Sequence, residues 1–287
     1  MKIAWIGTGV MGAPMAGHLI AAGHQLVAYN RTRAKADAWA AQHGGDVAGT
    51  PAQAARGAGA VITCVGNDDD LSDVTLGRYG AFEAMDEAVV FIDHTTVSAT
   101  IARRLAGEAE ARGFLCVDAP VSGGQAGAQA GTLSIMCGGT KPAIAAATPI
   151  MQAYGARIVH VGDAGAGQQA KMANQIAIAG VIQGVAEALR FAQKSGLDTA
   201  AVLDAISGGA AQSWQMVNRW GSMSEDRFDF GFAVDWMRKD LGLALAEARA
   251  NGAVLPVAAL VDQFYAEVQA MGGGRQDTSA LVRRLPK

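Results

Sequence analysis

The sequence predicts an α/β domain with a mainly parallel, doubly wound sheet, followed by an all-helical domain. Through the first half, short apolar runs typical of strands alternate with helical stretches, which indicates a parallel sheet with helices on both faces. Beyond residue 163 the strand signals stop, and residues 168–195 form one long run with apolar residues at helical spacing. We therefore predict domains at 1–163 and 164–287, joined by a long interdomain helix.

The elements follow in a regular order. A short buried strand covers Lys2–Ile6, a helix covers 13–22, and a second strand covers 25–29. Further strand-like runs lie at 60–65, 88–92, 114–118, 133–137 and 157–161. Helices of the first domain are expected at 34–43, 98–112 and 142–154. Helices of the second are expected at 168–195, 200–206, 212–222, 234–251 and 256–271, with a turn or flexible tail at 272–274.

A glycine-rich turn with the pattern G-x-G-x-x-G follows the first strand. It contains Gly7, Gly9 and Gly12, with Val10 and Met11 between the last two. Such glycines let the backbone approach a pyrophosphate, and the next helix supplies N–H groups and positive potential. Glycine-rich turns are common, but one framed by strand, helix and second strand is typical of a Rossmann domain. We expect a dinucleotide site here.

The end of the second strand carries Asn30, Arg31 and Thr32, and no acid. An Asp or Glu at this place holds the ribose 2′-OH in NAD sites. Arg31 can instead form charge-assisted hydrogen bonds to a 2′-phosphate, with Asn30 and Thr32 as further donors. The alternative is a solvated arginine beside a helix N-cap threonine. We interpret the segment as favouring NADP, with NAD as the weaker alternative cofactor.

Composition narrows the classes of function. The 287 residues are 51% hydrophobic with a net charge of −3, enough for two cores and with no sign of nucleic-acid binding. Cys64, Cys116 and Cys137 are widely spaced beside apolar runs and are expected to be buried free thiols in a reducing compartment. A strand beginning at residue 2 leaves no room for a signal peptide, and no unbroken apolar run reaches ~18 residues. We expect a cytoplasmic protein with no membrane span.

Ligands of such sheets bind beyond the carboxyl ends of the strands, so the loops after those ends are the candidate site. One of them contains Ser122, Gly123 and Gly124, whose exposed N–H groups and hydroxyl could hold a substrate carboxylate. The alternative for this loop is a tight turn. The five histidines have no metal-ligand spacing, and the acids at 68–70 suit the first turn of a helix. We predict no metal site.

The long helix carries a polar cluster near its start. Lys171, Asn174 and Gln175 share one helix face, and their neighbours are small or apolar. Apolar surroundings lower the pKa of a lysine and suit it to proton exchange near neutrality. The alternative is an ordinary solvated helix face. Lys239 and Asp240 form a second candidate cluster, for which a solvated pair is the alternative.

Four motifs together resemble the β-hydroxyacid dehydrogenases, which include 3-hydroxyisobutyrate dehydrogenase, tartronate semialdehyde reductase and glyoxylate/succinic semialdehyde reductase. The motifs are Gly7-x-Gly9-x-Met11-Gly12-x-Pro14-Met15, residues 118–124 (DAPVSGG), residues 131–136 (GTLSIM) and residues 171–175 (KMANQ). Residues 239–241 (KDL) match a further segment of that family. The matches run in order from residue 1 to about 245, so jointly they are specific.

The resemblance implies a role for each matched position. It implies that Ser122, Gly123 and Gly124 bind the substrate carboxylate, that Lys171 is the catalytic residue, and that Asn174 and Gln175 supply amides. An Asn-Gln pair resembles the tartronate semialdehyde reductases more than the members with two asparagines. Thr96 matches a threonine at the nicotinamide end, and Phe232, Lys239 and Asp240 match positions at the mouth between domains. Residues 66–69 depart from the family's leucine-proline pattern, and we predict cofactor contacts there at Val65 and Asn67.

The resulting hypothesis is hydride transfer between NADP and a small β-hydroxy acid or its semialdehyde, with Lys171 as general acid and base. An imine reductase of similar architecture is one alternative, although such enzymes typically lack the lysine. A non-catalytic NADP-binding module is the other, and it leaves Ser122 and Lys171 unexplained. A homodimer or homotetramer is expected. The sequence does not name the substrate.

Overall fold

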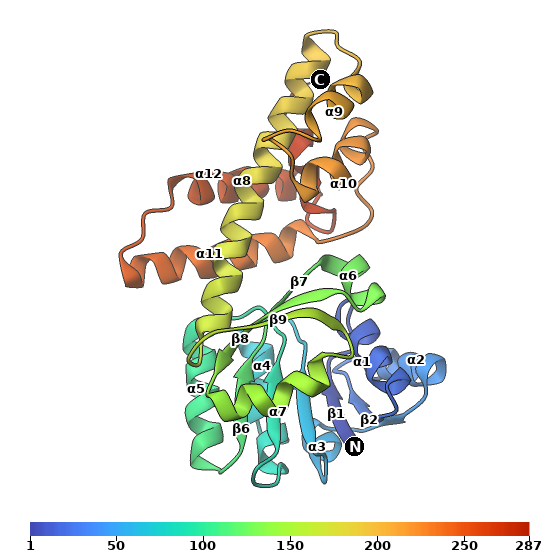
Figure 1. Ribbon diagram of the computed structural model, residues 1–287, viewed down its shortest axis with the longest axis vertical. Coiled ribbons are helices and arrows are strands. Elements are labelled where there is room, and N and C mark those ends of the chain that lie inside the picture. Colours follow the sequence, from blue (N-terminus) through green and yellow to red (C-terminus); the bar gives the residue numbers. More distant parts are fainter. Residues whose placement is uncertain (287) are drawn as a thin grey trace. The chain divides into compact units, whose positions relative to one another are not determined.

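The computed structural model describes residues 1–286, which form two compact units (Figure 1). The first unit is Met1–Lys171, and the second begins at Met172. The division therefore falls inside the long helix α8 (Ala166–Lys194), whereas the sequence places the domain boundary in the loop before it. Lys171 thus belongs to the same unit as the glycine-rich turn.

The first unit contains one sheet, whose strands are β1 (Lys2–Ile6), β2 (Gln25–Tyr29), β3 (Asp46–Val47), β4 (Ala60–Thr63), β5 (Val90–Asp93), β6 (Leu115–Asp118), β7 (Val121–Ser122), β8 (Leu133–Gly139) and β9 (Gly155–Gly162). Their spatial order is β3-β2-β1-β4-β5-β6-β8-β7, with β9 also paired to β8. Strands β1 to β6 pair in parallel, and β8 runs antiparallel to β6 and β7. The first six follow the order 3-2-1-4-5-6 of dinucleotide-binding folds. The predicted Rossmann sheet is confirmed.

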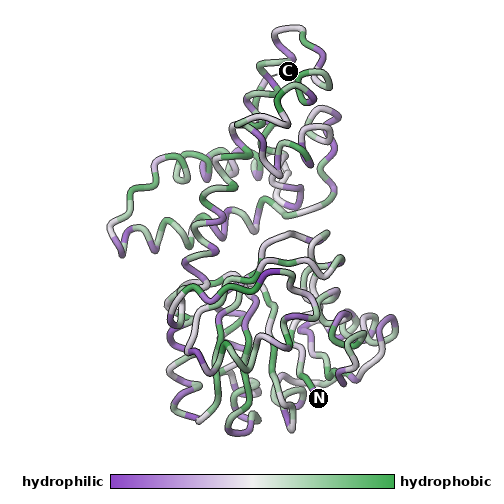
Figure 2. The backbone as a smooth tube through the Cα atoms, in the orientation of Figure 1, coloured by the Kyte–Doolittle hydropathy of each residue, from purple (hydrophilic) through white to green (hydrophobic). Residues whose placement is uncertain are grey.

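Alternate residues of the central strands fill two separate cores, because successive side chains of a strand point to opposite faces. In β1, Ile3 and Trp5 enter one core, while Ala4 and Ile6 enter the other. The first core is covered by α1 (Gly12–Ala21), α2 (Arg33–His43), α6 (Gly124–Ala130) and α7 (Lys141–Met151). The second is covered by α3 (Pro51–Ala55), α4 (Asp68–Leu76), α5 (Ala99–Ala111) and the 3-10 turn η1 (Ala81–Glu83). Figure 2 shows the resulting hydrophobic colouring along the strands.

The second unit is helical, as predicted. It contains most of α8 and the elements α9 (Thr199–Ile206), α10 (Trp214–Ser224), α11 (Val234–Asn251), α12 (Pro256–Ala270) and the 3-10 helix η2 (Thr278–Arg284). Ile182, Val185 and Leu189 of α8 pack in its core with Trp220 and Tyr265. Within residues 1–286, α8 is the one helix long and apolar enough to cross a membrane, judged by length and composition alone. In the structure, 44% of its most apolar 18-residue window is buried.

Differences from the predicted elements are local. Strands β3 and β7 have two residues each, too few for a periodic signal. The glycines at 272–274 form a turn, in which Gly273 N–H donates to Val268 O and Gly274 O accepts from Asp235 N–H. The 3-10 helix η2 follows, and its irregular period hid it in the sequence. The three cysteines are not in disulfides, as predicted, but only Cys137 is buried, whereas Cys64 and Cys116 are partly exposed.

Candidate active site

The glycine-rich turn has the geometry that a pyrophosphate-binding loop requires. Gly7 has φ +106°, and a Cβ there would lie 2.1 Å from Cys64 O. A Cβ on Gly12 would lie 2.1 Å from Gly7 O, so this glycine lets helix α1 pack against β1. Nothing lies within 4 Å of a Cβ built on Gly9, whose exposed backbone is open to a ligand. These are the three glycine roles of a dinucleotide fingerprint.

Two further observations in this turn fit a bound phosphate. Helix α1 begins at Gly12, after Met11, which supplies no side-chain cap, so no capping side chain competes with an anion for the positive end of the helix. The hydroxyl of Thr8 is buried and has no hydrogen-bond partner within residues 1–286. A buried hydroxyl without a partner is rare in native proteins. The residues present therefore fit a dinucleotide.

Asn30, Arg31 and Thr32 come together beside this turn, as the sequence predicts. The amide of Asn30 accepts from Thr8 N–H at 3.0 Å and donates to Thr32 O at 3.0 Å, which ties the end of β2 to the glycine turn. Thr32 is the N-cap of α2, but its side chain makes no capping hydrogen bond. The guanidinium of Arg31 is 79% exposed. All three side chains can therefore be reached by a cofactor.

Arg31 forms an ion pair with Asp70 of α4. No local sequence pattern reveals this acid as a neighbour of the cofactor segment, because 39 residues separate it from Arg31. Asp70 also belongs to the first turn of α4, where Asn67 is the N-cap and accepts from Asp70 N–H at 2.8 Å. The acids at 68–70 thus occupy a helix start, as predicted. An adenosine 2′-phosphate would compete with Asp70 for Arg31.

The loops after β4 and β5 contact each other and carry three predicted cofactor-binding residues. Val65 N–H donates to the hydroxyl of Thr95 at 3.0 Å, so the segment after β4 is held against the loop that carries Thr96. The side chain of Asn67 is exposed but is used as a helix cap. Val65, Asn67 and Thr96 therefore lie at the carboxyl ends of neighbouring parallel strands, where ligands of such sheets bind.

The Ser122 loop is shaped by short antiparallel pairing. Ser122 pairs with Ser134 of β8, and Gly123 and Gly124 follow with φ +132° and +61°. These positive values favour glycine. Gly123 O accepts the N–H of Gly127 at the start of α6. The tight turn that the sequence offers as the alternative is therefore present.

Helix α8 begins against the carboxyl ends of β5 and β6. The carboxylate of Asp118 accepts from Gly165 N–H at 2.7 Å and from Gln168 N–H at 3.0 Å. Burial raises the pKa of Asp118 to about 6. The side chain of Gln168 donates to Thr95 O at 2.8 Å and accepts from Val97 N–H at 3.1 Å. Lys171 is buried three residues later, so the predicted catalytic lysine is held at the ligand-binding edge of the sheet.

Two buried titratable residues near this edge are unsuited to proton transfer. His94 Nδ1 contacts Ala119 O at 2.6 Å and Nε2 contacts Tyr154 Oη at 2.8 Å, and burial lowers the pKa of His94 to about 4. Asp93 binds the Thr63 hydroxyl at 2.7 Å, and burial raises its pKa to about 7. Both side chains are at most 2% exposed. They hold the core rather than reach a ligand.

In the second unit, the predicted polar residues of α8 and α11 meet. Gln175 donates to the carboxylate of Asp240 at 2.7 Å, and Asn174 donates to Gln175 Oε1 at 2.8 Å. Lys239 lies 3.2 Å from Asp240 and over the ring of Trp236. Asp240 is only 2% exposed, so the alternative of a simple solvated pair is wrong for this acid. The cluster is a connected network of amides and charges.

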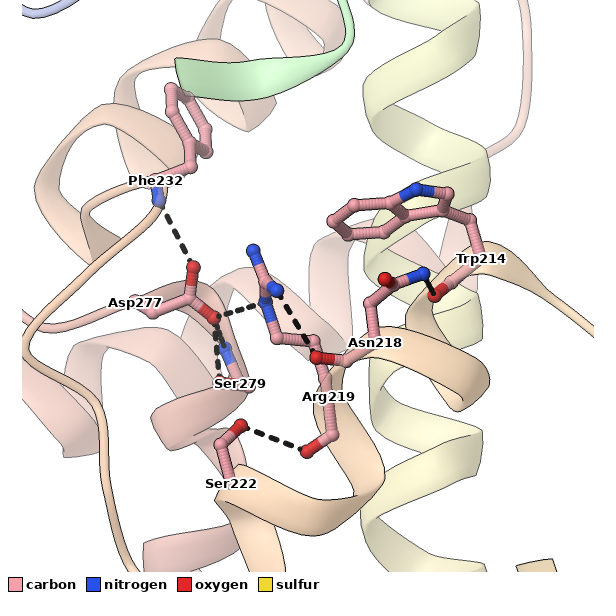
Figure 3. Close-up of polar contacts among 7 residues, drawn as sticks. All are labelled: Trp214, Asn218, Arg219, Ser222, Phe232, Asp277 and Ser279. Carbon is pink, nitrogen blue, oxygen red and sulfur yellow. Dashed lines mark hydrogen bonds and ion pairs between the residues drawn. The ribbon is translucent and has the colours of Figure 1, made fainter. Parts of the chain in front are cut away.

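Phe232 belongs to a second network in this unit (Figure 3). Its N–H donates to Asp277 at 3.0 Å, and the same carboxylate binds Arg219 at 3.1 Å and Ser279. The guanidinium of Arg219 lies over the rings of Trp214 and Phe230. Asp277 follows a glycine-rich turn far along the chain, so no local pattern reveals its link to Phe232. Among residues 1–286, no three His, Cys, Asp or Glu side chains are grouped to hold a metal ion.

Comparison with known proteins covers both units. Residues 2–162 match the family described as the NAD-binding domain of 6-phosphogluconate dehydrogenase. Residues 165–285 match the family described as NAD-binding of NADP-dependent 3-hydroxyisobutyrate dehydrogenase. The ranges change at the loop before α8, close to the boundary that the sequence suggests.

Individual relatives span the whole chain. An uncharacterised oxidoreductase of Shewanella frigidimarina is 56% identical over 286 residues, covering 100% of this chain and 98% of the relative. The 2-hydroxy-3-oxopropionate reductase of Escherichia coli is 35% identical over 285 residues, covering 99% and 97%. The solved structure of Mycobacterium tuberculosis 3-hydroxyisobutyrate dehydrogenase with L-serine is 34% identical with a TM-score of 0.89, covering 100% and 99%.

Proposed function

The chain belongs to the 3-hydroxyisobutyrate dehydrogenase, or β-hydroxyacid dehydrogenase, family of NAD(P)-dependent oxidoreductases, and from this premise we propose its reaction. It transfers a hydride reversibly between NADP(H) and C3 of a small β-hydroxy acid or the corresponding semialdehyde. The observation that carries the proposal is the placement of Lys171. A buried lysine sits at the start of α8, which is anchored to the strand ends of the same unit that holds the glycine-rich turn.

The protein's part in the reaction is binding and proton transfer. The nicotinamide, when bound, supplies or accepts the hydride. In reduction, Lys171 as an ammonium donates a proton to the alkoxide oxygen that forms as the carbonyl is reduced. In oxidation, neutral Lys171 takes the hydroxyl proton. Ser122 and the N–H groups of Gly123 and Gly124 bind the substrate carboxylate, since hydroxyl and backbone N–H donors suit an anion.

The proposed cofactor is NADP, with NAD as the weaker alternative. Arg31 supports this preference because its guanidinium is exposed at the end of β2, where Asn30 and Thr32 also lie. An acid at 30–32 would bind a ribose 2′-OH, and the chain has none there. The second matched family carries an NADP-dependent description, which agrees with this choice.

The proposed substrates are 3-hydroxyisobutyrate and tartronate semialdehyde. The relatives above include a 3-hydroxyisobutyrate dehydrogenase, 34% identical, and a 2-hydroxy-3-oxopropionate reductase, 35% identical. The substrate named for the second, 2-hydroxy-3-oxopropionate, is tartronate semialdehyde. Asn174 and Gln175 favour the second, because an Asn-Gln pair resembles the tartronate semialdehyde reductases. A cytoplasmic location and assembly into a homodimer or homotetramer stay predictions.

The test is a substrate screen with both cofactors. NADP-coupled oxidation of 3-hydroxyisobutyrate, glycerate, serine, 4-hydroxybutyrate and glycolate is compared with the same reactions with NAD. We expect turnover of a β-hydroxy acid with NADP, and loss of that turnover in Lys171→Ala. Reduction of cyclic imines without turnover of any hydroxy acid would indicate an imine reductase. Cofactor binding without turnover of any substrate would indicate a binding module.

A further inference from the structure

The first turn of α8 contains a fully buried glutamine whose side chain reaches the loop after β5. Gln168 Nε2 donates to Thr95 O at 2.8 Å, and its Oε1 accepts from Val97 N–H at 3.1 Å. The two backbone groups flank Thr96, the residue that we place at the nicotinamide end. Both hydrogen-bonding ends of the amide are therefore used to hold the cofactor loop.

Asp118 holds the same turn from the neighbouring strand. Its carboxylate accepts backbone N–H groups of Gly165 and Gln168 at 2.7 and 3.0 Å, and the side chain is 4% exposed. A Cβ on Gly138 or Gly167 would lie 2.5 or 2.7 Å from this carboxylate, so the neighbouring glycines leave room for it. A carboxylate also suits the positive end of the helix.

We propose that Gln168 and Asp118 are positioning residues, which together fix Lys171 relative to the loop that carries Thr96. The inference rests on the proposed function, in which Lys171 transfers the proton. Lys171 follows Gln168 by three residues, about one helical turn, so a shift at Gln168 is transmitted to the lysine. All of these residues lie in the first unit, so the arrangement is independent of where the second unit lies.

The chemistry of the two residues supports positioning rather than packing. An apolar side chain could fill the volume of Gln168, but it could not hold the backbone on both sides of Thr96. Burial raises the pKa of Asp118 to about 6, so the fold keeps an acid where ionisation is disfavoured. Proton transfer depends steeply on geometry, and a misplacement of ~1 Å can reduce a rate by ~10²-fold.

The experiment compares two positioning variants with two matched controls. Gln168→Leu removes both side-chain hydrogen bonds, and Asp118→Asn keeps the shape but leaves one helix N–H facing an amide donor. Gln183→Leu changes a buried glutamine farther along α8, and Asp262→Asn changes a buried acid of α12 that binds Arg238 and touches neither clamp residue. For each variant, kcat, KM and the dissociation constant of NADPH are measured well below the melting temperature.

We expect kcat to fall by ~10–100-fold in both positioning variants, with NADPH affinity within ~3-fold of the wild type. The controls should keep kcat within ~3-fold of the wild type. Gln168→Glu keeps the acceptor for Val97 N–H but turns a carboxylate oxygen toward Thr95 O, so it should also lose activity, and less so at low pH, where the protonated carboxyl can donate to Thr95 O. If Asp118→Asn does not fold, the two Gln168 variants still test the inference.

Three outcomes would overturn the inference. Wild-type kcat in Gln168→Leu and Gln168→Glu, combined with an inactive Lys171→Ala, would show that the clamp has only a structural role. A lower melting temperature with unchanged kcat would show the same. Full activity of Lys171→Ala would instead overturn the proposed function, and the inference with it.

Discussion

Replacing Arg31 by alanine should weaken binding of NADPH far more than binding of NADH. The Arg31 side chain is 79% exposed and pairs with the partly buried Asp70, so it can exchange that partner for a ligand phosphate. NADPH carries the 2′-phosphate that such a group would bind, and NADH does not. The comparison of two cofactors in one variant therefore isolates this single contact.

The size of the effect follows from the contacts that are exchanged. A hydrogen bond to a charged group contributes about 1.5–3 kcal/mol. The exposed pair with Asp70 contributes about 0–1 kcal/mol and is given up when the phosphate binds. The net loss in Arg31→Ala is then about 0.5–3 kcal/mol, which corresponds to a rise of roughly 2–150-fold in the dissociation constant of NADPH.

Asp70→Asn provides the opposite perturbation. It removes the competing carboxylate and its repulsion of the phosphate, so NADPH should bind about 2–5-fold more tightly at low ionic strength. Asn can still occupy the first turn of α4. Both variants are titrated with NADPH and NADH by nicotinamide fluorescence, and the titrations are repeated at high salt, where the effect of Asp70→Asn should shrink.

A change in the dissociation constants of NADPH and NADH by the same factor in Arg31→Ala would contradict this prediction. Such a result would mean that Arg31 contacts a part shared by both cofactors, or none. Tighter NADH binding in Asp70→Asn, equal to any gain for NADPH, would also remove the role given to this acid.

Three further predictions concern the lysine, the glycine turn and a buried acid. Lys171→Ala should lower kcat by ~10²–10⁴-fold while the dissociation constant of NADPH stays unchanged. Gly9→Ala should weaken NADPH binding, because its Cβ would stand where the backbone approaches the pyrophosphate, but it should not change the melting temperature, because this Cβ meets nothing within 4 Å in the protein. Gly12→Ala should lower the melting temperature, because its Cβ would lie 2.1 Å from Gly7 O. Burial raises the pKa of Asp93 to about 7, so the unfolded chain ionises this carboxyl at a lower pH than the folded protein does. The free energy of unfolding therefore falls as pH rises from about 4 to about 7, and the full loss is present above about pH 7. Asp93→Asn should therefore melt higher relative to the wild type at about pH 8 than at about pH 5, and a constant difference in calorimetry would contradict this.

The sequence by itself determined the class of fold and the order of its elements. Alternating residues of a strand and the 3.6-residue spacing of a helix are local patterns, so β1, β2 and α11 are found almost to the residue. The glycine fingerprint is equally local, because one turn between β1 and α1 contains all of its parts. Motif order also identified Lys171 and Ser122 as candidates before any contact was known.

The tertiary structure decided which distant residues act together. Asp70 faces Arg31 across 39 residues because parallel crossovers bring the ends of β2 and β4 to one edge of the sheet. Asp118 and Gln168, 50 residues apart, meet because the end of antiparallel β8 pairs with the end of β6, and β9 runs beside β8 into α8. Spacing in the chain carries no record of such contacts. The sequence therefore specified the glycine turn and the lysine, while folding supplied the groups that hold the lysine in place and the acid that competes for the arginine.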